Sequence, residues 1–443
     1  MDRMNARQRI AVVGAGISGL ASAWLLAGKY DVTLFEAGQY LGGHTNTVDV
    51  TLEGKTHPVD TGFLVFNERT YPNLIAMFDH LGVDSVDTEM SFSVVLDTPA
   101  LEWAGSNLAT VFGQKSNLLR PAFWGMLSDI LRFNRESRVW LETHPGDAGT
   151  LDAFLQAGGY SAQFADWYLL PMAAAIWSCP TGQMRGMPLA SFVRFCQNHG
   201  LLQIFDRPSW RTVLGGGREY VKRLAAHIAD IRLACPVSSI HHEGRGLRVI
   251  HAQGSDYFDQ VVMACHSDQA LQILGGTASE AQREVLAAIR YQPNRAVLHT
   301  DAALLPKRKA LWSAWNYFAG SAKDGEQPVG VSYLINRLQP LPFETPVVVT
   351  LNPVIEPDPA KVLAAFDYAH PVFDAAAIAA QQRLLEDFWR IQGRGGIWLA
   401  GAWGSYGFHE DGLKSALRVA NALAVTAPWQ SANTLLPPER AVA

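Results

Sequence analysis

Cysteine is scarce in this chain and forms no metal-binding or dithiol pattern. Only four cysteines occur among 443 residues, and they are widely separated. None belongs to a C-x-x-C pair, so the sequence predicts neither a metal site nor a redox dithiol. No signal peptide is recognisable, so we expect a cytoplasmic protein whose thiols are buried and reduced: Cys179, Cys196, Cys235 and Cys265.

Basic charge is also scarce. Lysine and arginine number 36 against 41 acidic residues, which gives a formal net charge of −5. A nucleic-acid partner requires a basic surface that faces the phosphates, and the chain contains no basic run. We therefore expect no nucleic-acid partner.

A long uninterrupted hydrophobic run is missing as well. The strongest candidate for a membrane-spanning helix is the uncharged stretch 167–184, which is close to the minimum length. Pro171 and Pro180 interrupt it. We therefore expect a buried helix followed by a turn.

What the chain does contain is a substantial core, with 48% hydrophobic and 17% charged residues. Its length exceeds what one hydrophobic core supports, so two domains are expected. Apolar runs predict a β-α-β unit in 10–36, and further strands in 231–264 that we expect to join it in space. Residues 71–203 look largely helical. A strand is expected at 396–400 and a last helix at about 412–424.

The loop after the first strand carries a G-x-G-x-x-G motif at Gly14, Gly16 and Gly19. The first glycine permits a tight turn, the second lets the backbone approach a pyrophosphate, and the third allows close helix–strand packing. The helix N-terminus that follows offers free N–H groups to an anion. Glu36 ends the second strand, where an acid can accept hydrogen bonds from a ribose. These features together predict a dinucleotide site.

A second glycine pair, Gly42 and Gly43, follows the acid at Glu36. It provides another close approach of backbone to nucleotide, which NAD enzymes do not need. The acid at Glu36 also disfavours the 2′-phosphate of NADP. The sequence therefore predicts FAD as the cofactor.

At these positions the sequence resembles the flavin amine oxidase superfamily, which includes amine oxidases, protoporphyrinogen oxidases and carotenoid desaturases. The resemblance rests on four blocks: 14–36, 42–43, 235–266 and 399–417. It implies an α/β fold in which a discontinuous Rossmann-like FAD domain (1–75, 205–290 and 390–430) joins an α+β substrate domain (76–204 and 291–389), with a tail at 431–443. It implies that FAD contacts Gly14, Ala15, Gly16, Ile17, Ser18, Gly19, Glu36, Ala37, Gly42, Gly43, His44, Thr45, Thr61, Gly62, Phe63, Val237, Ala264, Gly401, Ala402, Gly412 and Leu413.

A narrower resemblance concerns bacterial NAD/FAD-binding proteins and the oxidase-like domain ahead of plant cyclopropane-fatty-acid synthases. It rests on the segments 61–67, 70–73, 90–94, 176–180, 198–203 and 207–210. It implies a fatty-acyl or phospholipid-linked substrate, which the enzyme dehydrogenates by hydride transfer to flavin N5. Two alternatives are an oxygen-using amine oxidase and a flavin module without turnover that serves a lipid methyltransferase.

Two departures from the amine oxidase pattern also favour a substrate other than an amine. Many of those enzymes place a tyrosine three residues before the glycine of the C-terminal motif, and His409 stands there in this chain. Many also hold a lysine near flavin N5, whereas the comparable stretch 291–297 has only Arg295.

A helix that starts near Gly412 is expected to stabilise negative charge at the flavin N1/O2 edge.

Candidate reacting groups are few. His409 and His44 are the candidates for catalysis, and each fits a structural hydrogen-bonding role equally well. Glu410 and Asp411 either act as a base or cap the last helix. Asp60 resembles a family position near the flavin ring, where we expect it to support its neighbours rather than react.

The stretch 101–140 interleaves aromatic and basic residues. The first interpretation is that the aromatic residues form the core of the helical region. The second is that one face contacts an anionic bilayer, as a lipid substrate requires, which would place the protein peripherally at the inner face of the membrane. The residues concerned are Trp103, Phe112, Phe123, Trp124 and Phe133, with Lys115, Arg120, Arg132 and Arg135.

Overall fold

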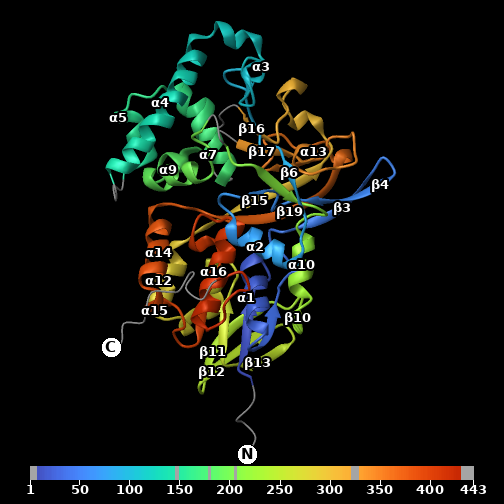
Figure 1. Ribbon diagram of the computed structural model, residues 1–443, viewed down its shortest axis with the longest axis vertical. Helices are drawn as coiled ribbons and strands as arrows, with labels where there is room; N and C mark the ends of the chain where they lie inside the picture. The colour runs from blue at the N-terminus through green and yellow to red at the C-terminus, as the bar shows by residue number, and fades with distance from the viewer. Residues whose placement is uncertain (1–6, 145–148, 178–180, 204–206, 321–328, 431–443) are drawn as a thin grey trace, which may run out of the picture.

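The computed structural model describes residues 7–144, 149–177, 181–203, 207–320 and 329–430. The molecule is elongated, with a lower half built around a parallel sheet and an upper half of helices and a second sheet (Figure 1). Segments from the beginning, middle and end of the chain lie side by side in the lower half. The predicted mixed α/β fold is confirmed, whereas the residue boundaries of the two domains remain a prediction.

The lower half is organised by a five-stranded parallel sheet. Its central strands are almost fully buried on both faces, as their continuous apolar runs require. Each strand is paired in register with its neighbours, so that Val13 stands between Phe35 and Met263. The strand order is β10 (Asp230–Arg232), β2 (Asp31–Phe35), β1 (Arg9–Val13), β14 (Gln260–Met263) and β20 (Ile397–Leu399).

Two helices lie against each other beside this sheet: α1 (Ile17–Ala27) and α16 (His409–Ala422). The expected start of the last helix at Gly412 is wrong, because the helix begins at His409. Asp411 accepts a hydrogen bond from the Phe408 amide at 3.1 Å and so caps the earlier start. Gly412 instead lies in the first turn, where it allows α16 to approach α1.

The remaining elements of the lower half flank the parallel sheet. One group is an antiparallel three-stranded sheet with β11 (Val237–Glu243), β12 (Gly246–His251) and β13 (Gly254–Phe258). The helices are α2 (Pro72–Leu81), α10 (Arg218–Ala225), α11 (Ser267–Leu274), α12 (Glu280–Ala288), α14 (Ala375–Glu386) and α15 (Phe388–Ile391).

A seven-stranded sheet separates the lower half from the helices at the top. Its strand order is β19 (Val362–Pro371), β15 (Tyr291–His299), β18 (Val348–Leu351), β17 (Val329–Leu334), β16 (Trp315–Ala319), β7 (Phe92–Leu96) and β8 (Leu101–Ala104). The strands β15 and β19 cross the middle of the molecule, next to α2 and α16 (Figure 1). This sheet therefore covers the end of the lower half at which the glycine loop lies.

Two small sheets connect the halves. One pairs β3 (Thr47–Leu52) with β4 (Lys55–Asp60), and the other has the order β5 (Phe66–Asn67), β9 (Trp210–Val213) and β6 (Ser85–Thr88). The expectation that residues 71–203 are largely helical is therefore wrong for 85–104, which form β6, β7 and β8. These strands are short; β6 pairs with β9 and β7 pairs with β16, each more than 120 residues away in the chain, and β8 pairs with β7.

The top of the molecule is helical. It contains α3 (Leu108–Val111), the 3-10 helix η1 (Lys115–Leu119), α4 (Pro121–Thr143), α5 (Leu151–Ala157), α6 (Ala162–Phe164), a π-helical turn (Ala165–Leu169), α7 (Leu170–Trp177), α8 (Thr181–Arg185) and α9 (Leu189–Asn198). Among the described residues, no helix combines the length and the apolar composition that crossing a membrane requires.

The cysteines follow the prediction with one difference. Cys196 and Cys235 are buried free thiols, as expected, whereas the free thiol Cys265 lies in a residue that is only partly buried. Cys179 and the predicted tail 431–443 lie outside the described residues.

Candidate active site

The glycine loop adopts the conformation that its three glycines predict. Gly14 has φ +101°, and a Cβ there would stand 3.0 Å from the Ala264 backbone. A Cβ at Gly19 would collide with the carbonyl oxygen of Gly14, whereas one at Gly16 would meet nothing within 4 Å. The backbone at Gly16 thus faces open space. The helix α1 begins directly after it, with no side-chain cap and no acid in its first turn.

The second glycine pair lies directly beside this loop. Gly42 forms a bridge with Gly16 and donates its N–H to Ala15 O at 2.8 Å. Both glycines have positive φ, +120° at Gly42 and +59° at Gly43, and a Cβ at Gly43 would stand 3.1 Å from the Gly16 Cα. The two predicted glycine segments therefore form one backbone cradle.

Glu36 holds the cradle at the end of β2. Its carboxylate accepts hydrogen bonds from the N–H of Ala15 at 2.8 Å and of Gly38 at 2.7 Å. On the other side, the backbone of Glu36 pairs with Arg232 and Cys235. The strand β11 starts at Val237, two residues after Cys235, so this predicted FAD contact lies near Glu36 in the chain's path.

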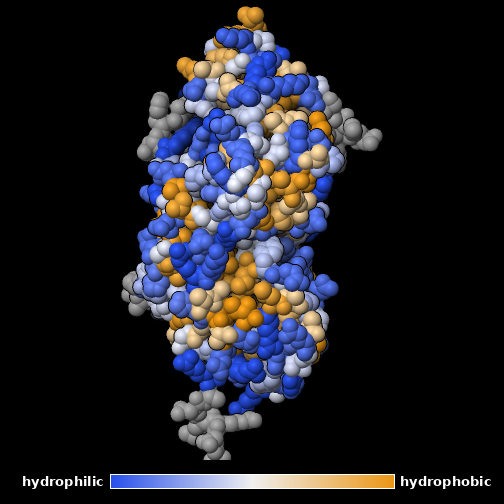
Figure 2. Space-filling view, turned by 90° about the vertical axis from the view of Figure 1, so that its right-hand side faces the viewer, coloured by the Kyte–Doolittle hydropathy of each residue, from blue (hydrophilic) through white to orange (hydrophobic). Residues whose placement is uncertain are grey.

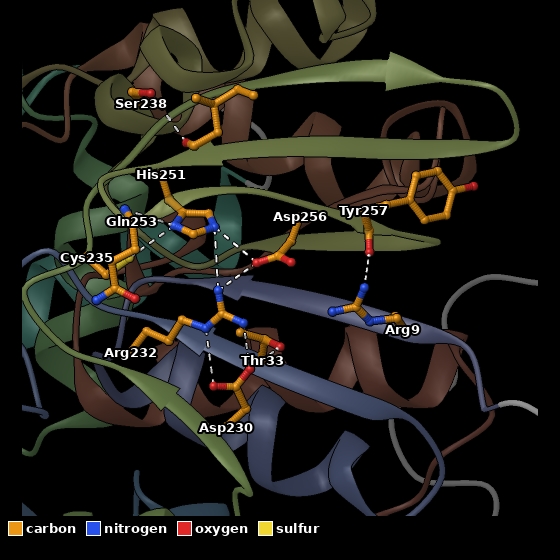
Figure 3. A network of polar contacts seen from close by, with 11 residues as sticks. Arg9, Thr33, Asp230, Arg232, Cys235, Ser238, His251, Gln253, Asp256 and Tyr257 are labelled. Atoms are coloured by element: carbon orange, nitrogen blue, oxygen red, sulfur yellow. Dashed lines mark hydrogen bonds and ion pairs between the residues drawn. The ribbon is translucent and has the colours of Figure 1, made fainter.

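A polar network fixes this end of the site (Figure 3). Arg232 lies between two carboxylates and donates to Asp230 at 3.0 Å and to Asp256 at 2.6 Å. His251 donates from Nε2 to Asp256 at 3.1 Å and accepts from the Cys235 thiol at 3.4 Å. Hydrogen bonding to Arg232 lowers the pKa of Asp256. The network thereby ties β10, β11, β12 and β13 together next to Glu36.

His44 lies at the other end of the cradle, in a cluster of aromatic rings. Its ring stacks on Tyr368 with centroids 5.0 Å apart, and lies 5.2 Å from His370 and 6.1 Å from His266. Burial lowers the pKa of His44 well below its usual value, and the neighbouring histidines lower it further. The Nε2 atom of His44 is buried and has no hydrogen-bond partner among the residues that the structure describes. An unpartnered buried nitrogen beside two glycine turns marks a place where a polar ligand fits.

The other members of this cluster are also uncharged. His266 stacks on Tyr291 with centroids 4.3 Å apart, and His370 Nδ1 bonds the Asn294 amide at 3.0 Å. Burial lowers the pKa of His370 to about 4 and also lowers the pKa of His266. The three histidines of this cluster are therefore neutral at pH 7.

His409 is held by two hydroxyls at the start of α16. Its Nε2 lies 2.8 Å from Thr45 Oγ1 and 3.2 Å from Tyr220 Oη. The ring stacks on Phe63 with centroids 3.7 Å apart. Burial lowers the pKa of His409 to about 3, so the imidazole is neutral. These contacts bring together four positions that the sequence spreads over more than 360 residues.

Asp60 and Thr61 brace the same region from β4. The Asp60 carboxylate accepts hydrogen bonds from Thr47 Oγ1, from the Gly217 N–H at 3.0 Å and from Gln339 Nε2 at 2.8 Å. Burial raises the pKa of Asp60 to about 6. Thr61 bonds the Tyr368 hydroxyl at 2.9 Å. Asp60 therefore holds its neighbours in place, in line with its predicted supporting role.

The C-terminal block closes the cradle from the side of α1. Gly401 N–H donates to Ser415 Oγ at 2.9 Å, and Ser18 Oγ donates to the carbonyl of Gly412 at 3.0 Å. A Cβ at Gly412 would stand 2.7 Å from Ile17 Cγ2. The side chain of Leu413 is fully buried in the core, so it can reach a cofactor only through its backbone.

The profile of the flavin containing amine oxidoreductases matches residues 17–301. The chain belongs to this family. A short segment of 48 residues, 11% of this chain and 9% of the relative, is 46% identical to an L-amino-acid oxidase from Pseudechis australis.

Solved structures of the same fold agree with this family assignment in their overall architecture. A fatty acid isomerase from P. acnes has a TM-score of 0.65 at 14% identity, and the match covers 94% of this chain and 99% of that one. A cyclohexylamine oxidase from Brevibacterium oxydans IH-35A gives 0.64 at 17% identity, with 94% and 100% covered. A putrescine oxidase bound to putrescine gives 0.63 at 16%, with 94% and 99% covered.

This member of the family is thus an FAD-dependent oxidoreductase, and its residues fit the cofactor. The open backbone at Gly16 and the free N–H groups of α1 suit a pyrophosphate, and the carboxylate of Glu36 suits a ribose. The unpartnered Nε2 of His44, next to Gly43 in the chain, could accept a hydrogen bond from such a ligand or donate one to it. The individual FAD contacts remain predictions, as does a contact of Ala37, Gly62, Ala264 or Ala402 with the cofactor.

Two of the alternatives for reacting groups are decided by hydrogen bonds. Glu410 accepts from the N–H groups of Asn73 at 3.2 Å and Leu74 at 2.9 Å, so it caps α2 rather than α16. Asp411 caps its own helix, and burial raises its pKa to about 6. Arg295 is exposed and pairs with Glu356 at 2.7 Å, so it does not replace a lysine near the flavin.

The catalytic roles of His44 and His409 stay predictions, but the surroundings of both side chains bear on these roles. A pKa far below 7 keeps an imidazole neutral but makes it a weak proton acceptor. His409 in addition has its Nε2 engaged by Thr45 and Tyr220. Both histidines therefore fit the positioning of neighbouring groups better than proton removal.

An aromatic wall stands beside the N-terminus of α16. Phe408 lies with its ring centroid 5.2 Å from that of Phe195 and 5.6 Å from that of His199, and Tyr406 lies 5.6 Å from Phe195. Burial lowers the pKa of His199 to about 4, so this ring is neutral too. We call these four residues the aromatic wall.

Four further residues of the site escaped the sequence-based prediction: Tyr220, His266, Tyr368 and His370. A signal for two of them exists, because Tyr368 and His370 alternate in a run that forms β19 and so share one face of a strand. His266 is the last residue of a block that carried the family resemblance, but no role was predicted for it. Tyr220 has no local signal.

Proposed function

We propose that this FAD-dependent oxidoreductase dehydrogenates a fatty-acyl chain, free or linked to a phospholipid. The position we favour is at or near a methylated or cyclopropanated carbon, as the resemblance to the domain ahead of plant cyclopropane-fatty-acid synthases suggests. The observation that carries the proposal is the aromatic wall beside the N-terminus of α16.

The wall suits an apolar chain because it offers aromatic faces and neutral groups. The two carboxylates next to it, Glu410 and Asp411, already accept hydrogen bonds from backbone amides, and Glu410 also pairs with the Lys414 ammonium at 3.5 Å. An acyl chain needs no charged partner and is held by buried apolar contact. The likeness to a fatty acid isomerase shows that the fold occurs in a protein named for fatty-acid chemistry.

The site suggests which part of the reaction the cofactor would carry out and which part the protein would carry out. FAD, when bound, would supply the acceptor for the hydride that the acyl chain loses, and the proton from the neighbouring carbon would pass to a base, for which His44 and His409 remain the predicted candidates. The wall orients the chain and excludes water, and the hydroxyls of Thr45 and Tyr220 keep the ring of His409 fixed against Phe63. The residues of this chain would thus position the substrate and exclude water from it, and they would not supply a charged group.

An amine substrate is the competing interpretation, because aromatic faces also attract cations. The fold neighbours favour it as strongly as they favour a lipid, since they include a putrescine oxidase and a cyclohexylamine oxidase. The two interpretations differ in which compound loses hydrogen.

The test uses the FAD-loaded protein with phospholipid vesicles and an artificial electron acceptor. The acyl chains are then released and analysed by mass spectrometry. We expect a product that lacks two hydrogens, and none with protein from which FAD has been removed. Unchanged acyl chains together with oxidation of simple amines would overturn the proposal.

A pair of variants of Phe408 sharpens the test. Phe408→Asp places a charge in the aromatic wall, so we expect loss of acyl turnover while the bound flavin keeps its absorbance spectrum. Phe408→Leu preserves an apolar side chain and should retain most of the turnover. Equal activity of both variants would show that the wall does not hold the substrate.

A further inference from the structure

We propose that the helical tip of the molecule docks on an anionic phospholipid bilayer. The tip comprises residues 108–139, which include α3, η1 and most of α4. These helices stand at the end of the long axis opposite the five-stranded sheet (Figure 1). The inference concerns a surface remote from the cradle and holds whichever compound is oxidised.

The tip exposes apolar side chains in unusual density. Among the described residues, thirteen large apolar side chains have substantial exposure, and six of them belong to the tip. Leu119 is 87% exposed and Leu108 is 77% exposed, and these two are the most exposed of all thirteen. The six are Leu108, Leu118, Leu119, Trp124, Leu131 and Val139. Clustered exposure of this kind indicates an interaction surface, whereas single exposed leucines are ordinary.

Figure 2 shows apolar residues between hydrophilic ones at the top end of the molecule. The mixture is the one that an interfacial helix requires, with apolar groups entering the acyl boundary and polar groups remaining in water. The opposite face of α4 packs into the molecule, because Phe123, Met126 and Phe133 on that face are fully buried. Burial supports the core interpretation for this face of the stretch, whereas contact of the exposed face with a bilayer is the proposal.

The charge of the tip is opposite to that of the whole chain. Residues 108–139 contain five basic and two acidic residues, whereas the chain carries a net charge of −5. The two acids already have partners: Asp129 accepts from Ser161 Oγ at 2.7 Å and pairs with Arg132 at 3.0 Å, and Glu136 accepts from the Tyr160 hydroxyl at 2.7 Å and pairs with Arg135 at 3.5 Å. Among the described residues, none forms an ion pair with the basic residues Lys115, Arg120 and Arg138.

A groove along α4 adds a second basic feature. Its volume is about 550 Å³, and it is lined in part by Leu131, Arg135, Arg138 and Val139. The side chain of Arg135 is 74% exposed. Exposed apolar residues thus alternate with guanidinium groups along the helix, spaced to meet acyl chains and phosphate groups of one membrane surface.

Charge complementarity selects the bilayer over a second copy of this chain. Two copies that met through their tips would bring ten basic residues together, five from each, against four acids that already have partners. An anionic bilayer instead attracts the tip and repels the acidic remainder of the molecule, which sets one orientation. That orientation points α4 toward the membrane and the cradle away from it.

The experiment is co-sedimentation of the FAD-loaded protein with vesicles of phosphatidylglycerol and phosphatidylcholine, or of phosphatidylcholine alone. We expect binding to the mixed vesicles, weaker binding in high salt, and little binding to phosphatidylcholine. Arg138→Ala should weaken binding roughly fivefold, the contribution of one cation near such a surface. Arg245→Ala is the matched control, since Arg245 is exposed outside the tip, and it should bind as the wild type does.

The apolar part of the tip is tested with the double variant Leu119→Ser and Leu131→Ser. Its binding should fall by at least about tenfold, because both leucines would leave the acyl boundary. The double variant Ile355→Ser and Leu385→Ser removes exposed apolar residues elsewhere and should bind normally. All four changes lie at exposed positions, so thermal unfolding should be unaltered.

Three results would overturn the proposal. One is the absence of binding to anionic vesicles, another is binding that the tip variants do not weaken, and the third is a dimer that dissociates when Leu119 and Leu131 are replaced. None of these measurements involves turnover, so each outcome leaves the proposed dehydrogenation to its own test.

Discussion

Replacement of Gly412 by alanine tests the packing that closes the cofactor cradle. A Cβ at this position would stand 2.7 Å from Ile17 Cγ2 and 2.9 Å from Ser18 Oγ. Neither neighbour can give way freely, because Ile17 and Ser18 are buried at the start of α1 and Ser18 donates to the Gly412 carbonyl. The helix α16 must therefore move away from α1.

The expected cost follows from the kind of contact. Forcing an extra carbon into a packed interface costs about 1–3 kcal/mol. Losing the hydrogen bond between Ser18 and Gly412 adds about 1 kcal/mol. We therefore expect Gly412→Ala to lower the free energy of unfolding by about 2–4 kcal/mol, and to weaken FAD binding because the two helix starts no longer flank the cradle.

The assay is urea unfolding of FAD-free protein, followed by circular dichroism, together with an FAD titration. Gly28→Ala is the matched control at the other end of α1, where φ is −65° and a Cβ would meet nothing within 4 Å. Alanine there should be neutral or stabilise by about 0.4–1 kcal/mol. A Gly412→Ala protein as stable as the control would refute the close-packing account.

Other substitutions test single contacts. Thr45→Val removes a buried hydroxyl that bonds His409 and Tyr220, so the free energy of unfolding should fall by about 1–3 kcal/mol, whereas the exposed Thr56→Val should have almost no effect. Arg295→Ala should change stability by less than about 1 kcal/mol and leave FAD affinity unaltered, because its ion pair with Glu356 is exposed; a large loss of affinity would contradict this. The pKa of His370 is lowered to about 4, so the unfolded chain binds more protons between pH 4 and 6.5 and acidification through this window destabilises the fold. Relative to His370→Asn, wild-type stability should therefore drop by up to about 3 kcal/mol from pH 7 to pH 4, and a constant difference in urea unfolding would disprove the burial of a neutral ring.

Local sequence signals were sufficient wherever an element is specified by its own residues. The first strand, the glycine loop and α1 agree with the prediction to within one residue, because a tight turn and a buried apolar run have few alternatives. The strand β13 (Gly254–Phe258) was not predicted, because its five residues are mostly polar and it lies at a sheet edge. The strands β6 and β7 depend on partners that are distant in the chain, and β8 pairs in turn with β7.

The site divides in the same way. Gly16, Gly42 and Glu36 were predicted because close backbone approach restricts the residue type at each position. The partners of His44 were not predicted, because Tyr368 and His370 reach it from a strand more than 320 residues further along the chain. The capping of α2 by Glu410 likewise depends on tertiary packing, which no local pattern reports.

The measurement that tests the central claim most directly is an anaerobic titration of the FAD-loaded protein. Phospholipids with methylated or cyclopropanated acyl chains are added in one series and simple amines in another, while the flavin absorbance is recorded. The account predicts that the lipids bleach the flavin band and that the amines do not. Bleaching by amines alone would contradict it.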